Sequence, residues 1–328
     1  MKKDYPRVCL EDSAYSLFLY FLISSKEEIE STYYFFSDGI PQTVCRFFQS
    51  QSHFFNPRYC KNRKIYHPVR FFYSLFLRWT AAWRWPFLKT ANLYGLEICF
   101  FSPMLVGYRK MVSIEDGFSN YFVVDRKPKL PYLKRLFFGP LINCEFPGRD
   151  AKHLSKVVLT GMCDTGYPTD IEIEWLDMQK AWDISSNEKK QLILNIYAIT
   201  ADDIKELQQR DEIVLTQTLS EDNVITEEEK ITFYKQMLKG KELSKVLIKP
   251  HPREKTDYAR YFPGAFVFKK KVPMQFLNLL GIRYKKVYTI CSTAAFSFPY
   301  KTDVMFLGSE CHPNIVEKYG IVKRPDND

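Results

Sequence analysis

Short runs of β-branched and aromatic residues alternate with helical patterns along the first half of the chain. Strands are predicted over residues 7–10, 32–36 and 96–101, and helices over 13–22, from 41 onward and within 69–88. Ser13 is a suitable N-cap for the first helix, and Pro41 suits the first turn of the second. Alternation of strands with helices is typical of βαβ units and a parallel sheet.

The second half repeats this alternation. Ser185 with Glu188, and Thr200 with Asp203, resemble capping boxes, so two helices are predicted between 185 and 207. Strands then follow over 212–216, 245–248, 265–268, 286–290 and 303–307, with helices over 226–240 and 273–281. We therefore predict an α/β protein with two Rossmann-like, doubly wound domains, residues 1–205 and 206–328, facing a cleft.

Composition narrows the class of protein. Hydrophobic residues make up 46% of the 328 positions, which is enough for two cores, and the formal net charge of +9 favours anionic partners. The N-terminus lacks a signal-peptide pattern, and no apolar stretch reaches the ~18 residues that a membrane span needs. The eight cysteines show no Cys-x-x-Cys and no zinc spacing, so we expect reduced thiols, a cytoplasmic location and no metal site.

The most informative motif is the run Lys249-Pro250-His251-Pro252-Arg253, which follows the apolar residues 246–248. A buried strand that stops at a rigid turn would present His251 between two cations at the carboxyl edge of a sheet, where α/β proteins bind ligands. Such a site suits a phosphate. The alternative is a solvated loop histidine, since His67 and His312 also precede prolines.

Ser292-Thr293 follows the strand predicted over 286–290 and precedes a helix start at Ala294. Hydroxyls and free amides at a strand-to-helix junction can bind an anion, because a helix N-terminus offers unpaired N–H groups. An ordinary N-cap explains the pair equally simply.

Glu115-Asp116-Gly117 follows the short apolar run 111–114, which fits a turn at a strand end. A carboxylate there, facing the phosphate site across the cleft, can take a proton from an attacking hydroxyl, and the adjacent like charge can raise its pKa. The alternative is a plain Asp-Gly turn.

Three short motifs of this chain resemble, in their order, the three motifs of the bacterial sialyltransferases. They are Glu115-Asp116-Gly117, His251-Pro252 and Ser292-Thr293. Those enzymes have two Rossmann-like domains of the GT-B type. The chain length and the strand that opens the second domain resemble glycosyltransferase family 52 most, with the polysialyltransferases second.

This resemblance implies inverting, metal-independent and cofactor-free transfer of sialic acid from CMP-sialic acid to a sugar hydroxyl. By match, Asp116 is the general base and His251 stabilises or protonates the departing phosphate, while Ser292-Thr293 binds that phosphate and Thr216-Gln217 lines the nucleotide pocket. The other motif residues are expected to bind substrate: Glu115, Gly117, Lys249, Pro252 and Arg253. The first domain would then bind the acceptor, and the second the nucleotide sugar.

Two segments, 69–88 and 127–138, mix cations with aromatic residues and can lie on an anionic membrane; a core helix and a solvated loop are the alternative. A peripheral membrane location suits a galactose-terminated, lipid-linked O-antigen, capsule or lipooligosaccharide acceptor. A homodimer is compatible with the sequence. Two other readings stay open. One is a GT-B enzyme with a different donor, or one that builds polysialic acid. The other is a non-catalytic basic protein that binds membranes or nucleic acid, although no nucleic-acid motif occurs.

Overall fold

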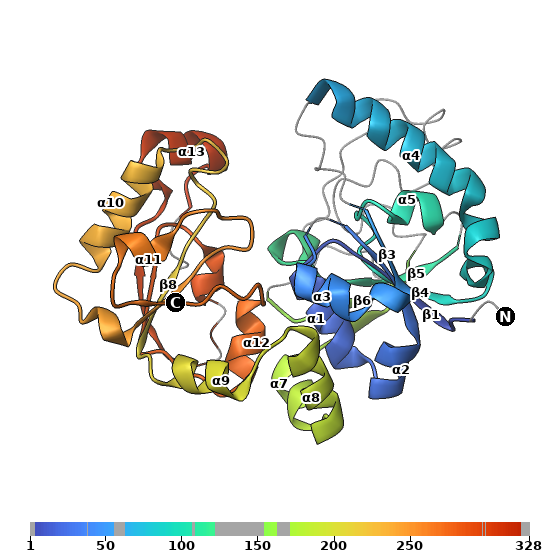
Figure 1. The fold of residues 1–328 in the computed structure, drawn as a ribbon, viewed down its shortest axis with the longest axis horizontal. Helices are drawn as coiled ribbons and strands as arrows, with labels where there is room; N and C mark the ends of the chain where they lie inside the picture. The colour runs from blue at the N-terminus through green and yellow to red at the C-terminus, as the bar shows by residue number, and fades with distance from the viewer. Residues whose placement is uncertain are drawn as a thin grey trace. The chain divides into compact units, whose positions relative to one another are not determined.

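The computed structural model describes residues 4–37, 39–55, 63–106, 109–121, 154–162, 171–296, 298 and 300–322. The chain forms two compact units, Met1–Tyr197 and Ala198–Asp328, called unit 1 and unit 2 below. Each unit is an α/β layer structure built on one sheet (Figure 1). The division falls before the helix that opens unit 2, whereas the sequence predicted a boundary near residue 205.

Unit 1 contains a seven-stranded sheet in the order β3-β2-β1-β4-β5-β6-β7, and all of its pairings are parallel. Its strands are β1 Arg7–Glu11, β2 Thr32–Phe36, β3 Ser52–Phe54, β4 Asn92–Gly95, β5 Met111–Ile114, β6 Leu154–Leu159 and β7 Ile173–Trp175. Its α-helices are α1 Ala14–Ile23, α2 Lys26–Ser31, α3 Gln42–Phe47, α4 Arg63–Arg84, α5 Ser102–Leu105, α7 Met178–Asp183 and α8 Asn187–Ile196. Short 3₁₀ helices are η1 Gln49–Gln51, η3 Pro86–Lys89 and η4 Phe118–Tyr121.

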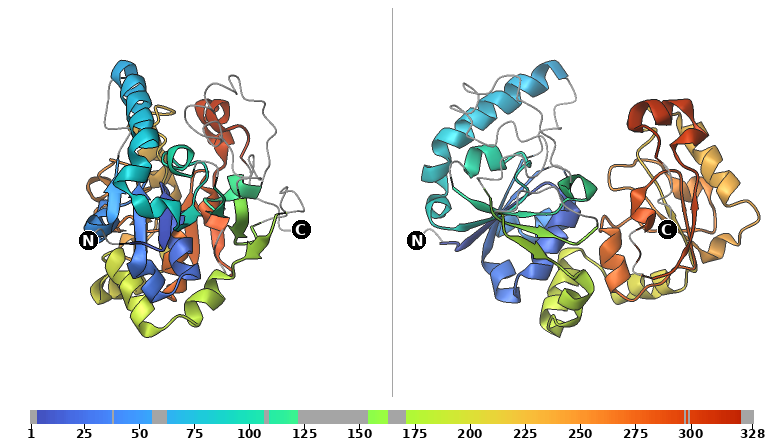
Figure 2. Two further views of the ribbon diagram at one scale, coloured as in Figure 1. Left: turned by 90° about the vertical axis from the view of Figure 1, so that its right-hand side faces the viewer. Right: turned by 180° about the vertical axis from the view of Figure 1, so that it is seen from behind.

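Helices cover both faces of this sheet, with α1 and α2 on one side and α4 on the other (Figure 2). Val8 and Leu10 of β1 share a core with Leu77 and Ala81 of α4. Because side chains alternate along a strand, the odd-numbered residues of β1 project toward α1 instead. This alternation directs Glu11, the last residue of β1, into the layer between the sheet and α1.

Unit 2 contains a five-stranded parallel sheet in the order β10-β9-β8-β11-β12. The strands are β8 Glu212–Leu215, β9 Val246–Lys249, β10 Phe266–Val267, β11 Lys286–Thr289 and β12 Asp303–Phe306. The helices are α9 Ala201–Gln208, α10 Glu227–Met237, α11 Tyr258–Tyr261, α12 Met274–Leu279 and α13 Pro313–Tyr319, with 3₁₀ helices η6 Leu243–Lys245, η7 Thr293–Phe296 and η8 Ser309–Cys311. Its order matches that of the first five strands of unit 1, so the predicted pair of Rossmann-like units is confirmed.

The strand predicted over 96–101 is wrong. The strand lies just before it, β4, and ends at Gly95, whose φ is +115°. A Cβ atom there would lie 2.1 Å from the carbonyl oxygen of Leu10, so only glycine fits, and the chain turns away from the sheet. The apolar residues that follow are buried in the turn and in the core beneath it, which explains their hydrophobicity without a strand.

Two predicted helix N-caps are confirmed, Ser13 of α1 and Thr200 of α9, and a third differs. Thr200 with Asp203, and Thr226 with Glu229, form complete capping boxes. At α8 the N-cap is Ser186 and not the predicted Ser185. The Ser185 hydroxyl donates instead to the carbonyl of Ala181 in α7. None of the helices in the described ranges is long and apolar enough to cross a membrane.

Candidate functional site

Polar side chains gather at the carboxyl edge of each sheet, close to the point where the strand order reverses. In unit 1 this point lies between β1 and β4, and the polar residues follow β1, β5 and β6. In unit 2 it lies between β8 and β11, and the polar residues follow β8, β9 and β11. Each unit therefore carries its own candidate site.

Glu115 directly follows β5, and protein donors enclose its fully buried carboxylate. The hydroxyls of Tyr15 and Tyr121 donate to it at 3.0 and 2.6 Å. Thr160, directly after β6, donates through its amide at 2.6 Å and its hydroxyl at 2.9 Å. Glu115 thus ties the ends of two strands to α1. These bonds support the strand ends, and substrate binding by Glu115 stays a prediction.

Asp116 lies one residue further and is only partly buried. Its amide donates to Asn120 Oδ1 at 2.8 Å, and the Asn120 amide donates to the Gly117 carbonyl at 3.1 Å, which closes the turn. Gly117 has φ +140°, a conformation that side chains disfavour. Burial raises the pKa of Asp116 to about 6, opposed by a hydrogen bond from Ser13 and assisted by the charge of Glu115. A carboxylate with this pKa suits a general base.

Glu11 is a further carboxyl at this edge that the sequence analysis did not select. It is fully buried at the end of β1, and Ser16 donates to its Oε1 at 2.9 Å. Within the part of the chain that the structure describes, its Oε2 has no hydrogen-bond partner. Burial raises its pKa well above the usual range, and the charges of Asp12 and Asp116 add to that shift. Burial and the neighbouring carboxylates therefore favour the neutral form of Glu11.

In unit 2, the predicted histidine turn follows β9. The Glu254 amide donates to the His251 carbonyl at 2.9 Å, and the His251 amide donates back to Glu254 Oε2 at 2.6 Å. Thr216, directly after β8, also bonds to that carboxylate through its hydroxyl. The turn is thus locked from two directions, and its strand-end position agrees with the sequence prediction.

One ring nitrogen of His251 accepts a hydrogen bond. The Arg253 amide donates to Nδ1 at 3.2 Å, so the neutral ring carries its proton on Nε2. His251 is exposed at the turn, but partial desolvation of its ring lowers its pKa to about 4, and the charges of Arg253 and Lys249 add to this effect. At neutral pH the residue therefore presents a neutral N–H donor.

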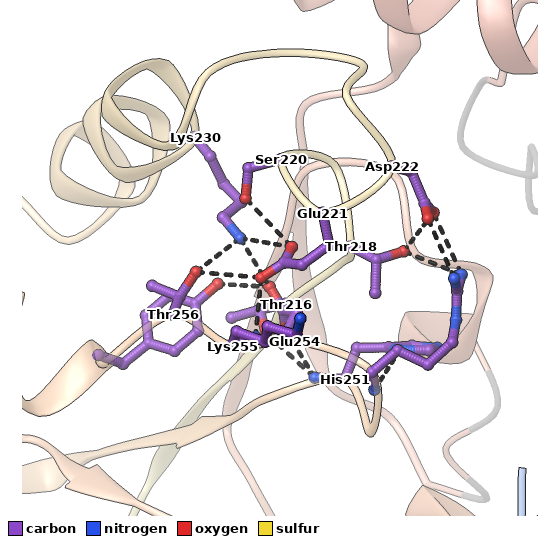
Figure 3. Close-up of polar contacts among 12 residues, drawn as sticks. Thr216, Thr218, Ser220, Glu221, Asp222, Lys230, His251, Glu254, Lys255 and Thr256 are labelled. Atoms are coloured by element: carbon purple, nitrogen blue, oxygen red, sulfur yellow. Dashed lines mark hydrogen bonds and ion pairs between the residues drawn. The ribbon is translucent and has the colours of Figure 1, made fainter. Parts of the chain in front are cut away.

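A buried ionic cluster lies behind the histidine turn (Figure 3). The ammonium of Lys230 lies 3.1 Å from Glu254 Oε1 and 3.1 Å from Glu221 Oε2, and it donates to Thr256 at 2.9 Å. Tyr258 adds a hydroxyl donor to Glu254 at 2.6 Å. The side chains of Lys230 and Glu254 are both 0% exposed. The sequence analysis missed this cluster, whose members come from three separate stretches of unit 2.

The two cations that flank His251 differ in their surroundings. Arg253 forms a bidentate ion pair with Asp222 at 3.0 and 3.1 Å and donates to Thr218 at 3.1 Å. Lys249 is buried, and this burial lowers its pKa to about 8. No hydrogen bond or ion pair reaches the Lys249 ammonium from the described residues. Lys249 is thus the flanking cation whose charge is left for an anionic ligand.

Gln217 bridges the switch point of unit 2. Its Oε1 accepts the Cys291 amide at 2.8 Å and so joins the end of β8 to the end of β11. Ser292 follows, with its amide bonded to Thr289 Oγ1 at 3.1 Å. Thr293 opens η7, a 3₁₀ helix of four residues and not the α-helix that the sequence predicted. Residues 292 and 293 therefore lie at the predicted edge of the sheet, but without the dipole of a long helix behind them.

Together these geometries give unit 1 a carboxylate base and unit 2 a neutral imidazole donor beside a buried lysine. A carboxylate with a raised pKa suits removal of a proton from a hydroxyl, and an N–H donor beside a cation suits an anionic group such as a phosphate. In the described ranges, no group of three His, Cys, Asp or Glu side chains is placed to hold a metal ion.

Comparison with known proteins identifies relatives. The model of glycosyltransferase family 52 matches residues 91–307. An uncharacterized protein of Haemophilus influenzae strain Rd is 31% identical over 309 residues, which is 94% of this chain and 95% of that protein. A crystal structure of an α/β-galactoside α-2,3-sialyltransferase from the luminous marine bacterium Photobacterium phosphoreum aligns over 93% of this chain and 91% of its own, with a TM-score of 0.47 and 12% identity.

Proposed function

This chain belongs to glycosyltransferase family 52, and on that premise we propose that it moves sialic acid from CMP-sialic acid to a terminal galactose hydroxyl with inversion and without a metal. The observation that carries the proposal is the His251 turn, which presents a neutral Nε2–H donor at the sheet edge next to buried Lys249. A departing nucleoside monophosphate needs this kind of charge stabilisation more than covalent help. The choice of sialic acid rests on the three-motif resemblance.

In the proposed reaction, the acceptor oxygen attacks the anomeric carbon of sialic acid while the bond from that carbon to the phosphate oxygen breaks. Asp116 takes the hydroxyl proton, and CMP leaves with the bonding electron pair. His251 donates a hydrogen bond to the phosphate, and Lys249 offsets its charge. Ser292 and Thr293 add hydroxyl donors. Attack opposite the leaving group inverts the anomeric configuration.

We propose that the acceptor is a lipid-linked O-antigen, capsule or lipooligosaccharide glycan, bound by unit 1, and that unit 2 binds the donor. The Thr216-Gln217 pair is the proposed contact to the nucleotide, since it follows β8 at the switch point. A cytoplasmic enzyme on the inner membrane face fits this acceptor. A polysialyltransferase, or an enzyme with another nucleotide-sugar donor, is the second candidate.

The direct test measures CMP release from CMP-sialic acid by the purified protein, with and without a galactose-terminated acceptor and in EDTA. We expect acceptor-dependent release that EDTA leaves unchanged. His251→Ala should lower the rate by about 10²–10⁴-fold. Equal release by wild type and His251→Ala would contradict the role of the histidine. Release only with a sialylated acceptor would favour the polysialyltransferase, and activity only with another nucleotide sugar would replace the donor.

The pH dependence gives an independent prediction. Because the pKa of Asp116 is raised to about 6, kcat/KM should fall about tenfold per pH unit below pH 6, as the base becomes protonated. The pKa of His251 is lowered to about 4, so the free enzyme should show no loss of kcat/KM from this ring between pH 7 and 8. On the basic side, kcat/KM should fall above pH 8 as Lys249, whose pKa is lowered to about 8, loses its charge. A decline centred near pH 7 would instead mean that a protonated His251 is required. Initial rates at low donor concentration across pH 4.5–8.5 measure both limbs.

A further inference from the structure

Helix α4 exposes a line of large aromatic side chains. Phe72, Phe76, Trp79 and Trp83 are 67%, 47%, 76% and 77% exposed. Their spacing of four, three and four residues places them on one face of the helix, along about three turns. We call these four residues the aromatic stripe. Soluble proteins rarely leave aromatic groups of this size together in water.

The stripe is separate from the face that holds α4 in place. Ser74, Leu77 and Ala81 are buried, and Leu77 and Ala81 belong to the core of unit 1. The helix thus has one apolar face packed in the protein and a second one exposed. Burial of the first face agrees with the core helix that the sequence analysis gave as an alternative. Packing in the core does not explain why the second face is apolar. Figure 1 shows α4 along the outside of its unit, next to α5.

The charge of α4 indicates what covers the stripe. The helix carries five cations and no acidic residue: Arg63, Lys64, Arg70, Arg78 and Arg84. The guanidinium of Arg84 lies 5.3 Å from the ring centre of Phe76, so a cation borders the stripe directly. A helix that combines Trp and Phe on one face with Arg and Lys, and that lacks acidic residues, is typical of helices that lie in the interface of an anionic bilayer.

We propose that the aromatic stripe seats α4 flat on an anionic phospholipid surface, with its rings among the headgroups and its cations against lipid phosphates. The described helix of 22 residues is about 33 Å long, which gives a contact line rather than a point. The inference does not depend on which sugar the enzyme transfers. The second basic aromatic segment predicted from the sequence, 127–138, lies outside the described residues.

Vesicle co-sedimentation tests the proposal. Purified full-length protein is mixed with vesicles of phosphatidylcholine alone or with added phosphatidylglycerol. We expect binding to the anionic vesicles that weakens with salt, and a decrease of about tenfold or more in Trp79→Ser/Trp83→Ser. The matched control is Trp175→Ser/Ile184→Ser, which removes two apolar side chains that are 54% and 78% exposed elsewhere in unit 1. Arg84→Gln, which removes the cation beside Phe76, should weaken binding to anionic vesicles only.

Three results would overturn the proposal. One is absence of wild-type binding to anionic vesicles. Another is binding that survives in Trp79→Ser/Trp83→Ser or falls equally in the control variant. The third is self-association without lipid that the stripe variant abolishes, since a second copy of the chain would then be the partner. Circular dichroism and turnover of a soluble acceptor should match wild type in the stripe variant, so failure to bind lipid is distinguishable from failure of the proposed reaction.

Discussion

Asp116→Asn is expected to lower kcat/KM for sugar transfer by about 10²–10⁴-fold, because it removes the carboxylate that we propose as the base for the acceptor hydroxyl. The amide keeps the size of the side chain and can still bond to Ser13, so the turn closed by Asn120 should persist. The measurement is the initial rate of acceptor-dependent product formation at saturating and limiting acceptor. A loss confined to KM, with kcat unchanged, would show that Asp116 binds acceptor without acting as its base.

The same substitution should not lower stability. Burial raises the folded-state pKa of Asp116 from 3.8 to about 6, so the ionised carboxylate is disfavoured in the folded protein. That cost is absent below pH 3.8, grows as the pH rises toward 6 and is fully present at pH 7. Asp116→Asn removes it, and the melting temperature at pH 7 should be equal to or above that of wild type.

Glu115→Gln is the matched control one residue away. Its carboxylate accepts bonds from Tyr15, Tyr121 and Thr160 in full burial, and an amide would turn a donor toward these donors. This variant should unfold at a lower temperature than wild type, because a buried network loses its acceptor. The two neighbouring substitutions thus have different expected effects. Asp116→Asn lowers the rate without lowering stability, and Glu115→Gln lowers stability. Equal effects of both variants on melting would contradict this division of roles.

The sequence was sufficient for the parallel α/β architecture because buried parallel strands are short and apolar and recur between capped helices. The strand prediction failed where apolar residues are buried outside the sheet. Residues 96–101 are as apolar as a strand, but the contact between Gly95 and the Leu10 carbonyl turns the chain out of the sheet. That close approach joins residues 85 positions apart, so no local pattern contains it. The short strands β6 and β7 were also missed.

The candidate site residues also fall into two groups, those that the sequence could indicate and those that only the fold brings together. Asp116 and His251 follow strands, so their motifs and the carboxyl-edge rule were enough to select them. The same rule applied to the first strand would have selected Glu11, which ends β1. No such rule points to Glu254, whose role comes from bonds to the His251 amide and to Lys230 across the fold. Arg253 lies two residues from the histidine in the sequence, but its pairing with Asp222 is a tertiary contact that spacing does not encode.

The cluster behind His251 gives the second large prediction. Lys230→Met should lower the free energy of unfolding by about 3–5 kcal/mol, the cost of leaving a buried charge without its partner. Lys230 neutralises Glu254 and Glu221 at 3.1 Å each, and Glu254 is fully buried. Burial already raises the pKa of Glu254, so loss of the ammonium should raise it further. Urea titration at pH 7 measures the change.

Lys245→Met is the matched control for this prediction. Its ion pair with Glu242 is 2.8 Å long, shorter than either contact of Lys230, but the two side chains are 54% and 62% exposed. Solvent screening should leave the free energy of unfolding of this variant close to that of wild type. Adding Glu254→Gln to Lys230→Met should restore part of the lost stability, because it removes the uncompensated charge. Similar costs for Lys230→Met and Lys245→Met would mean that contact distance, and not burial, sets the strength of these pairs.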